Sequence, residues 1–234
     1  MALKSVYQPH PSLHGGIIHI SDEEHRHLVV ARAEPGEWIE VFDGQGHVWK
    51  ASVVEVGKRQ TSARIETEDV VPRPSLELIL GQALIRNAAF ELALEKAVEV
   101  GVTRVIPFAA ERSNVSANQK LDRWLRIVVE AAKQSKRFHL PTLDRPKTFD
   151  EVLNVPAASR ILFAEREGAS IKSALLGSPV LFLVGPEGGW TENEIKSARD
   201  AGFREVTLGS GILRSETAAI VGAALIRHEI ENPS

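Results

Sequence analysis

Hydrophobic and polar positions divide the chain into two parts with different periodicities. In the first 70 residues, short runs in which apolar and polar residues alternate predict β-strands at 16–20, 38–42, 47–56 and 61–67. A helical stretch runs between them to about Arg32, with Ser21 as its expected N-cap and Glu24 closing a capping box. Several short strands around one small helix predict a compact barrel.

The second part begins after a probable linker at 71–75, where two prolines stand within three residues. Apolar strand runs then alternate with helical segments. Strands are expected at 76–82, 104–108, 161–164, 180–184 and 205–208, and helices at 88–100, 121–135, after Thr191 and over 218–226. This alternation predicts an α/β domain with a mostly parallel sheet covered by helices. We therefore expect two domains, at 1–72 and 73–234.

Two glycine-rich turns lie near the C-terminus, LVGPEGGWTENEI at 183–195 and LGSGILRSETAAI at 208–220. Each follows an apolar strand and leads into a helix, so both belong at the carboxyl edge of the sheet, where open α/β sheets bind ligands. Neither contains a GxGxxG or GxxxxGK[ST] pattern, which disfavours a Rossmann dinucleotide site and a P-loop. Either turn alone could be an ordinary strand–turn–helix connection, but the pair, with Glu187, Arg214 and Glu216, favours a ligand site.

Composition and charge narrow the classes of protein. The chain has 234 residues, of which 43% are hydrophobic and 25% charged, as is ordinary for a soluble globular protein. It lacks cysteine, which excludes disulfides and thiolate chemistry and is compatible with a reducing cytoplasm, where we expect the protein. No apolar run approaches the length of a membrane span. His25 and His27 point to different faces of a helix and lack a third ligand, so no metal site is expected.

The charge is unevenly distributed. The net charge of −3 argues against a globally basic nucleic-acid binder. Between Arg104 and Lys147, however, ten basic and four acidic residues give a net charge of +6. Such a segment can attract phosphates, although a solvated helix face is the alternative.

Several motifs in order carry a resemblance to a known family. The motifs are KAVEVGV (96–102), ERSNV (111–115), EAAKQSKRFHLP (130–141), GPEGG in the first glycine turn and ILRSETA in the second. Together they resemble the RsmE family of 16S ribosomal RNA methyltransferases, members of the SPOUT superfamily. The resemblance implies a C-terminal SPOUT domain with a trefoil knot, an exception to the rule that chains are not knotted. It also implies a small N-terminal PUA-like or OB-like barrel that binds RNA, and a homodimer.

The resemblance further implies S-adenosylmethionine as cofactor. The reaction would be methylation of N3 of one uridine, position 1498 in the standard numbering, in the 16S RNA of the small ribosomal subunit. Backbone groups of the two glycine loops would hold the adenosine, and two apolar side chains would bury it. The implied cofactor residues are Leu183, Gly185, Pro186, Glu187, Gly188, Leu208, Gly209, Ile212, Leu213, Arg214 and Thr217.

Arg214 is the expected catalytic cation, because uracil that loses its N3 proton carries negative charge on O2 and O4. Glu216 or Glu187 would accept that proton, although a carboxylate of ordinary pKa is a poor base for it. Alternatively, Arg214 forms a salt bridge with Glu216, and Glu187 accepts N–H bonds within its own loop. Trp190 is expected in the core or in the wall of the cofactor pocket.

Five basic residues are expected to position RNA phosphates: Arg32, Arg86, Arg112, Lys133 and Arg137. Val29 and Gly211 stand where the family has basic residues, which predicts a weaker or smaller RNA footprint. Two other functions remain open. A ribose 2′-O-methyltransferase on a similar knot fits the barrel and the EAAKQSKR segment less well. A non-catalytic RNA-binding or ribosome-assembly factor would not need the intact glycine loops and Arg214.

Overall fold

The structure is a computed structural model that describes residues 3–113, 121–164 and 168–232. Asn114 and Val115 of the ERSNV motif, and Lys120 of the basic segment, lie outside these residues. The chain forms two compact units: an N-terminal unit of Met1–Arg73 with Ala132–Leu140, and a C-terminal unit of Pro74–Ala131 with Pro141–Ser234. Among the described residues, no helix has both the length and the apolar character needed to cross a membrane.

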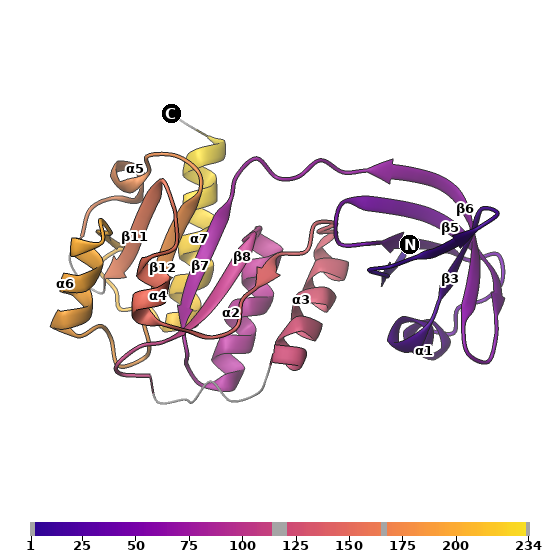
Figure 1. Ribbon diagram of the computed structural model, residues 1–234, viewed down its shortest axis with the longest axis horizontal. Helices are drawn as coiled ribbons and strands as arrows, with labels where there is room; N and C mark the ends of the chain where they lie inside the picture. The colour runs from indigo at the N-terminus through magenta and orange to yellow at the C-terminus, as the bar shows by residue number, and fades with distance from the viewer. Residues whose placement is uncertain (1–2, 114–120, 165–167, 233–234) are drawn as a thin grey trace. The chain divides into compact units, whose positions relative to one another are not determined.

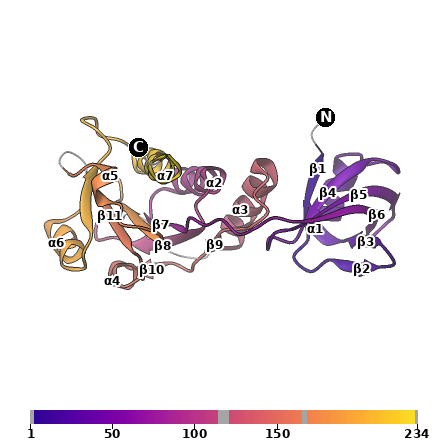
Figure 2. The same cartoon turned by 90° about the horizontal axis from the view of Figure 1, so that it is seen from above.

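The N-terminal unit is built on a six-stranded sheet in the order β1-β4-β5-β6-β3-β2 (Figure 2). Its strands are β1 (Lys4–Tyr7), β2 (Ser12–His14), β3 (Ile17–Ile20), β4 (Trp38–Phe42), β5 (His47–Val56) and β6 (Thr61–Val70). Only β1 and β4 pair in parallel. Alternate residues of these strands and Leu28 of helix α1 (Asp22–Val30) form the core. The small β unit expected from the alternating pattern is confirmed, while β1 and β2 had no clear signal in the sequence.

The expected capping box at the start of α1 is wrong. Ser21 makes no capping hydrogen bond, and its Oγ instead donates to Asp22 Oδ2 at 2.8 Å. Asp22 itself adopts a left-handed φ of 54°. Glu24, which was to complete the box, accepts hydrogen bonds from Lys133, 109 residues away in the chain. A buried carboxylate gains more from a lysine ammonium than from an exposed backbone N–H, so the long-range ion pair replaces the local cap.

The C-terminal unit contains a seven-stranded sheet in the order β10-β8-β7-β12-β11-β13, with β9 beside β8. The strands are β7 (Leu78–Ala83), β8 (Arg104–Ala109), β9 (Thr142–Leu143), β10 (Lys147–Thr148), β11 (Ser159–Ala164), β12 (Val180–Val184) and β13 (Arg204–Thr207). All pairings are parallel. Every residue of the central strands β7 and β12 is buried, as parallel strands covered on both faces require. The predicted parallel α/β sheet is confirmed.

Helices cover both faces of this sheet. They are α2 (Asn87–Val100), α4 (Phe149–Leu153), α5 (Ile171–Ala174), α6 (Glu192–Asp200) and α7 (Ser215–Glu231). A further helix, α3 (Leu121–Ser135), packs through Trp124 on Phe90 of α2, and its residues from Ala132 on belong to the N-terminal unit. Helices α2 and α7 lie side by side on one face, and α4 and α6 lie on the other (Figures 1 and 2). Gly101 ends α2 with a φ of 111°, which glycine adopts without strain. The chain therefore brings the ends of β11, β12 and β13 together at one edge of the sheet.

Candidate active site

A cavity of about 580 Å³ opens at the carboxyl ends of β11, β12 and β13. Both glycine-rich loops line it, with Phe163 and Ala164 of β11 and Arg86 after β7 completing the wall. The two loops contribute Gly185, Pro186, Glu187, Gly189, Trp190, Leu208, Gly211, Ile212, Leu213, Arg214, Ser215 and Glu216. The structure thus brings together the two segments that the sequence marked as a ligand site.

Trp190 fixes the first loop against the sheet. Its indole Nε1–H donates to the carbonyl of Phe163 at 2.9 Å, and its ring stacks on Phe108 with centroids 6.1 Å apart. A Cβ at Gly185 would approach the Trp190 ring to 2.9 Å, so only glycine allows the loop to pass this close. Trp190 therefore lies in the wall of the cavity.

The capping box at the start of α6 is confirmed. The Thr191 hydroxyl accepts from the backbone N–H of Glu194, whose carboxylate accepts from the Thr191 backbone N–H at 2.9 Å. Glu194 is buried and also accepts from the backbone N–H of Glu111. Arg112 donates from Nη1 to the carbonyl of Gly188 at 2.9 Å. The turn after β8 thus holds the first glycine loop through these two contacts. Arg112, which was expected to contact RNA, donates one of its N–H groups to this loop.

Ser215 joins the second loop to the first. Its buried hydroxyl donates to the carbonyl of Gly185 at 2.6 Å and accepts from the Nε2–H of Gln82 at 2.9 Å. Gln82 is itself 1% exposed, at the end of β7. Sequence reasoning did not assign either residue to the site. The available signal was a lone amide side chain inside an otherwise apolar strand run, because a buried polar group needs a partner.

The second loop presents apolar side chains to the cavity. Ile212 is 63% exposed and Leu213 is 37% exposed, and both line the cavity. Gly209 has a φ of 121°, and a Cβ at Gly209 or Gly211 would meet no atom within 4 Å. Exposed aliphatic side chains beside open backbone are suited to the flat, partly apolar face of an adenosine.

Four charged side chains stand around the cavity. The Glu187 carboxylate accepts a hydrogen bond from Arg86 Nε at 3.0 Å. This ion pair replaces the expected alternative, in which Glu187 accepts N–H bonds within its own loop. Arg214 precedes α7 and is exposed. Its backbone carbonyl accepts from Ala218 N–H at 2.8 Å, but no hydrogen bond or ion pair to its guanidinium is found within 3–113, 121–164 and 168–232. The alternative salt bridge between Arg214 and Glu216 is therefore absent from the described structure. Glu216 lies in the first turn of α7.

Four of the expected cofactor residues do not line the cavity. Leu183 is fully buried in β12, where its side chain packs against Gly81. Gly188 faces Arg112, and Gly209 forms the turn after β13. Thr217 is half-buried in α7. Their expected contact with a cofactor stays a prediction, and Leu183 stands in the hydrophobic core beneath the site.

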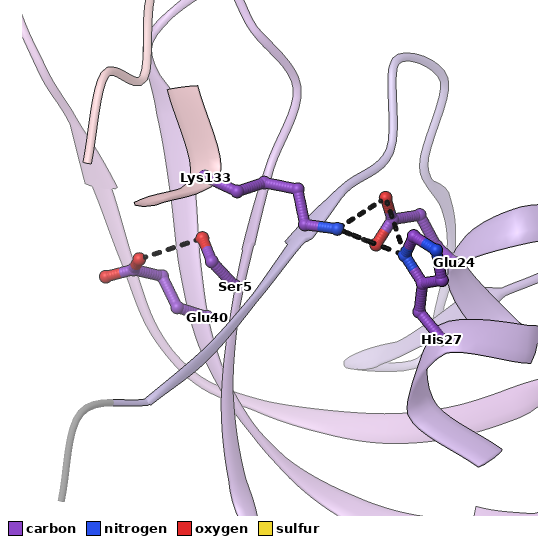
Figure 3. Close-up of polar contacts among 5 residues, drawn as sticks. All are labelled: Ser5, Glu24, His27, Glu40 and Lys133. Atoms are coloured by element: carbon purple, nitrogen blue, oxygen red, sulfur yellow. Dashed lines mark hydrogen bonds and ion pairs between the residues drawn. The ribbon is translucent and has the colours of Figure 1, made fainter. Parts of the chain in front are cut away.

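Lys133 of the expected RNA set makes contacts within the N-terminal unit. Its ammonium donates to both oxygens of Glu24, at 3.0 and 3.2 Å, and to Nδ1 of His27 at 3.3 Å (Figure 3). Both partners of the Lys133–Glu24 pair are only 11% exposed. Nearby, Glu40 accepts from Ser5 (Figure 3) and from Lys136. Two lysines of the basic segment therefore anchor its chain within this unit.

Other cations of the basic segment are also paired. Arg104 donates two hydrogen bonds to Asp144, and Lys147 lies 3.4 Å from the same carboxylate. Burial raises the pKa of Asp144, but the bonds from Arg104 and Lys147 outweigh it and leave the pKa below its ordinary value. Arg123 pairs with Glu91. Much of the segment's positive charge is thus neutralised locally.

The remaining residues of the RNA set differ in exposure. Arg32 is exposed just after α1 in a left-handed conformation, with a φ of 51°. Arg137 is half-buried, and Arg86 is 80% exposed at the cavity. Their contacts with RNA stay predictions.

Fold and site together define a class, the RNA methyltransferases. Residues 72–227 match the family model described as RNA methyltransferase domain, and residues 20–66 match that of RNA methyltransferase PUA domain. The chain belongs to the ribosomal RNA small subunit methyltransferase E family, as its motifs indicated. The Synechocystis protein of that name is 33% identical, over 99% of this chain and 79% of that one.

Two solved structures resemble the whole chain. Ribosomal RNA small subunit methyltransferase E from Neisseria gonorrhoeae, bound to S-adenosylmethionine, aligns with a TM-score of 0.90, 32% identity and 98% coverage of both chains. A Legionella pneumophila protein in complex with the same cofactor aligns with a TM-score of 0.90 and 29% identity, over 97% of this chain and 98% of that one.

Proposed function

We propose that this protein uses S-adenosylmethionine to methylate N3 of one uridine, position 1498, in the 16S RNA of the small ribosomal subunit. The observation that carries the proposal is the cavity between the two glycine loops, with Arg214 and Glu216 at its edge. Family membership supports the reaction class, and both solved relatives are named as holding this cofactor.

The residues of the cavity fit the cofactor. Open backbone at Gly211 leaves room beside polar peptide groups, while Ile212 and Leu213 offer apolar contact to an adenosine. The Ser215 hydroxyl joins the second loop to the first, and the Trp190 indole holds the first loop to β11. When bound, S-adenosylmethionine supplies an activated methyl group.

The chain's own residues would prepare the nucleophile. Uracil N3 must lose its proton before it can form a bond to carbon, and the resulting charge spreads over O2 and O4. Arg214 has no partner in the described chain to compete for its guanidinium, so it is free to donate to one of these oxygens. Glu216, in the first turn of α7 and on the cavity wall, is our proposed proton acceptor.

We also propose how the rest of the chain serves this reaction. Residues 1–72 would act as the RNA-binding domain and 73–234 as the methyltransferase domain, with its C-terminal segment knotted. The enzyme would work in the cytoplasm as a homodimer. Leu92 of α2 and Leu225 of α7 support the dimer, because they are 42% and 41% exposed on neighbouring helices and would be covered by a second subunit.

Titration calorimetry tests the cofactor site separately from the RNA. S-adenosylhomocysteine, the product of methyl transfer, should bind the purified protein without RNA, and Ile212→Glu should weaken it at least tenfold by placing a charge against the adenosine. Leu176→Glu is the matched control, since Leu176 lies outside the cavity and is 71% exposed, against 63% for Ile212. Absence of binding to the unaltered protein would refute both methyltransferase functions and favour the RNA-binding or assembly factor.

A further inference from the structure

Among the described residues that line the cavity, Arg86 and Glu187 form an ion pair. Arg86 stands just before α2, and Glu187 lies in the first glycine loop, 101 residues further along the chain. A single contact joins them, from Nε to Oε1 at 3.0 Å. Arg86 is 80% exposed and Glu187 is 38% exposed. The pair therefore joins two separate walls of the cavity at a place that solvent reaches.

This pair is easily broken. Exposed ion pairs contribute little because water solvates the separated charges and salt screens their attraction. The contact also uses one of the five N–H donors of Arg86. A phosphate can take two donors of a guanidinium at once, and such bidentate, charge-assisted contacts are stronger than single ones. A phosphate that reaches Arg86 would therefore compete well with the Glu187 carboxylate.

We propose that Glu187 is an internal competitor for the RNA phosphate that binds Arg86. Without RNA, the carboxylate occupies the guanidinium and keeps the two walls of the cavity joined. When a backbone phosphate takes Arg86, Glu187 is released. The inference rests on the proposed function, since it assumes that RNA is the substrate, and it adds a substrate-dependent exchange of partners at the edge of the cavity.

The exchange predicts an unusual result, because removing a side chain of the cavity should tighten RNA binding. Glu187→Gln should raise the affinity for unmethylated small ribosomal subunits by about two- to fivefold at low salt, the range that an exposed ion pair spans. Arg86→Gln should lower it. In the Arg86→Gln background, Glu187→Gln should have no further effect, because the competitor then has nothing to release.

Glu192→Gln is the matched control for charge. Glu192 lies exposed at the start of α6, beyond the same loop, and forms no ion pair among the residues that the structure describes. The Glu192→Gln substitution removes one unit of negative charge, as Glu187→Gln does, so it measures the long-range effect of that charge on RNA affinity. Thermal unfolding of each variant checks that the fold is intact. Substitutions at these exposed positions should shift the unfolding midpoint little.

Binding is measured by filter retention of labelled subunits without cofactor, so that a role of Glu187 in holding the cofactor does not interfere. The proposal is overturned if Glu187→Gln leaves RNA affinity unchanged, or if it raises affinity equally with Arg86 present or absent. Methyl transfer by the unaltered protein is followed in parallel. Transfer without the exchange effect overturns this inference alone, whereas no binding and no transfer overturn the proposed function.

Discussion

Ser215→Ala tests whether the link between the two glycine loops positions the site. The substitution removes the 2.6 Å bond to the Gly185 carbonyl and the 2.9 Å bond from Gln82, both of them buried. Gln82 keeps its bond to the Ala83 carbonyl at 3.1 Å, so its amide remains partly satisfied. With about 1 kcal/mol net for each lost bond, the free energy of unfolding should fall by about 2 kcal/mol.

The same change should weaken cofactor binding, because the Gly185 loop is no longer held to the start of α7. We expect the dissociation constant for S-adenosylhomocysteine to rise about five- to tenfold, the effect of roughly 1–1.4 kcal/mol. Urea unfolding followed by tryptophan fluorescence and titration calorimetry measure the two quantities. Ser210→Ala is the control, since Ser210 is exposed in the second loop. Equal stability and equal affinity for Ser215→Ala and Ser210→Ala would refute the positioning role.

Three further predictions address other parts of the chain. Glu24→Gln removes the carboxylate that accepts two hydrogen bonds from the Lys133 ammonium, 11% exposed, and should lower the free energy of unfolding by about 1–3 kcal/mol in urea titrations. Glu23→Gln, at an exposed position, should not. The pKa of Asp144 is lowered in the fold. Its contribution to stability is therefore present above the ordinary carboxyl pKa and is lost as the pH falls through the folded value. Asp144→Asn should be less stable than the unaltered protein at pH 7, and this difference in stability should disappear below about pH 4. Arg214→Gln should reduce the rate constant of methyl transfer about 10²- to 10³-fold in single-turnover assays, while the cofactor affinity stays within twofold. A loss of cofactor affinity instead would assign Arg214 to cofactor binding.

The parallel sheet of the C-terminal unit was predictable because its strands are buried on both faces. Such strands are continuous apolar runs, and β8, β12 and α2 begin and end within two residues of the expected bounds. The two glycine loops were predictable for the same reason, since carboxyl ends of parallel strands share one edge. The short strands β1 and β2 carry too few residues to show a period.

Side-chain pairing across the chain could not be predicted. Lys133 was expected to contact RNA because its segment resembles the family's, and its pairing with Glu24 was not expected. The local pattern around Ser21 gave the wrong partner for that carboxylate. Arg86 and Glu187 were assigned to RNA and to the cofactor, and the ion pair between them was not expected. A count of charged residues along a sequence gives the possible ion-pair partners, whereas the fold determines which of them come into contact.

The most direct test of the account is methyl transfer to a defined atom. Purified protein, methyl-labelled S-adenosylmethionine and small ribosomal subunits from cells lacking this activity are incubated together, and the digested RNA is analysed by mass spectrometry. Label should appear in 3-methyluridine at a single decoding-site position, and it should be lost with Arg214→Gln. Label on a ribose, or no transfer despite measurable cofactor binding, would contradict it.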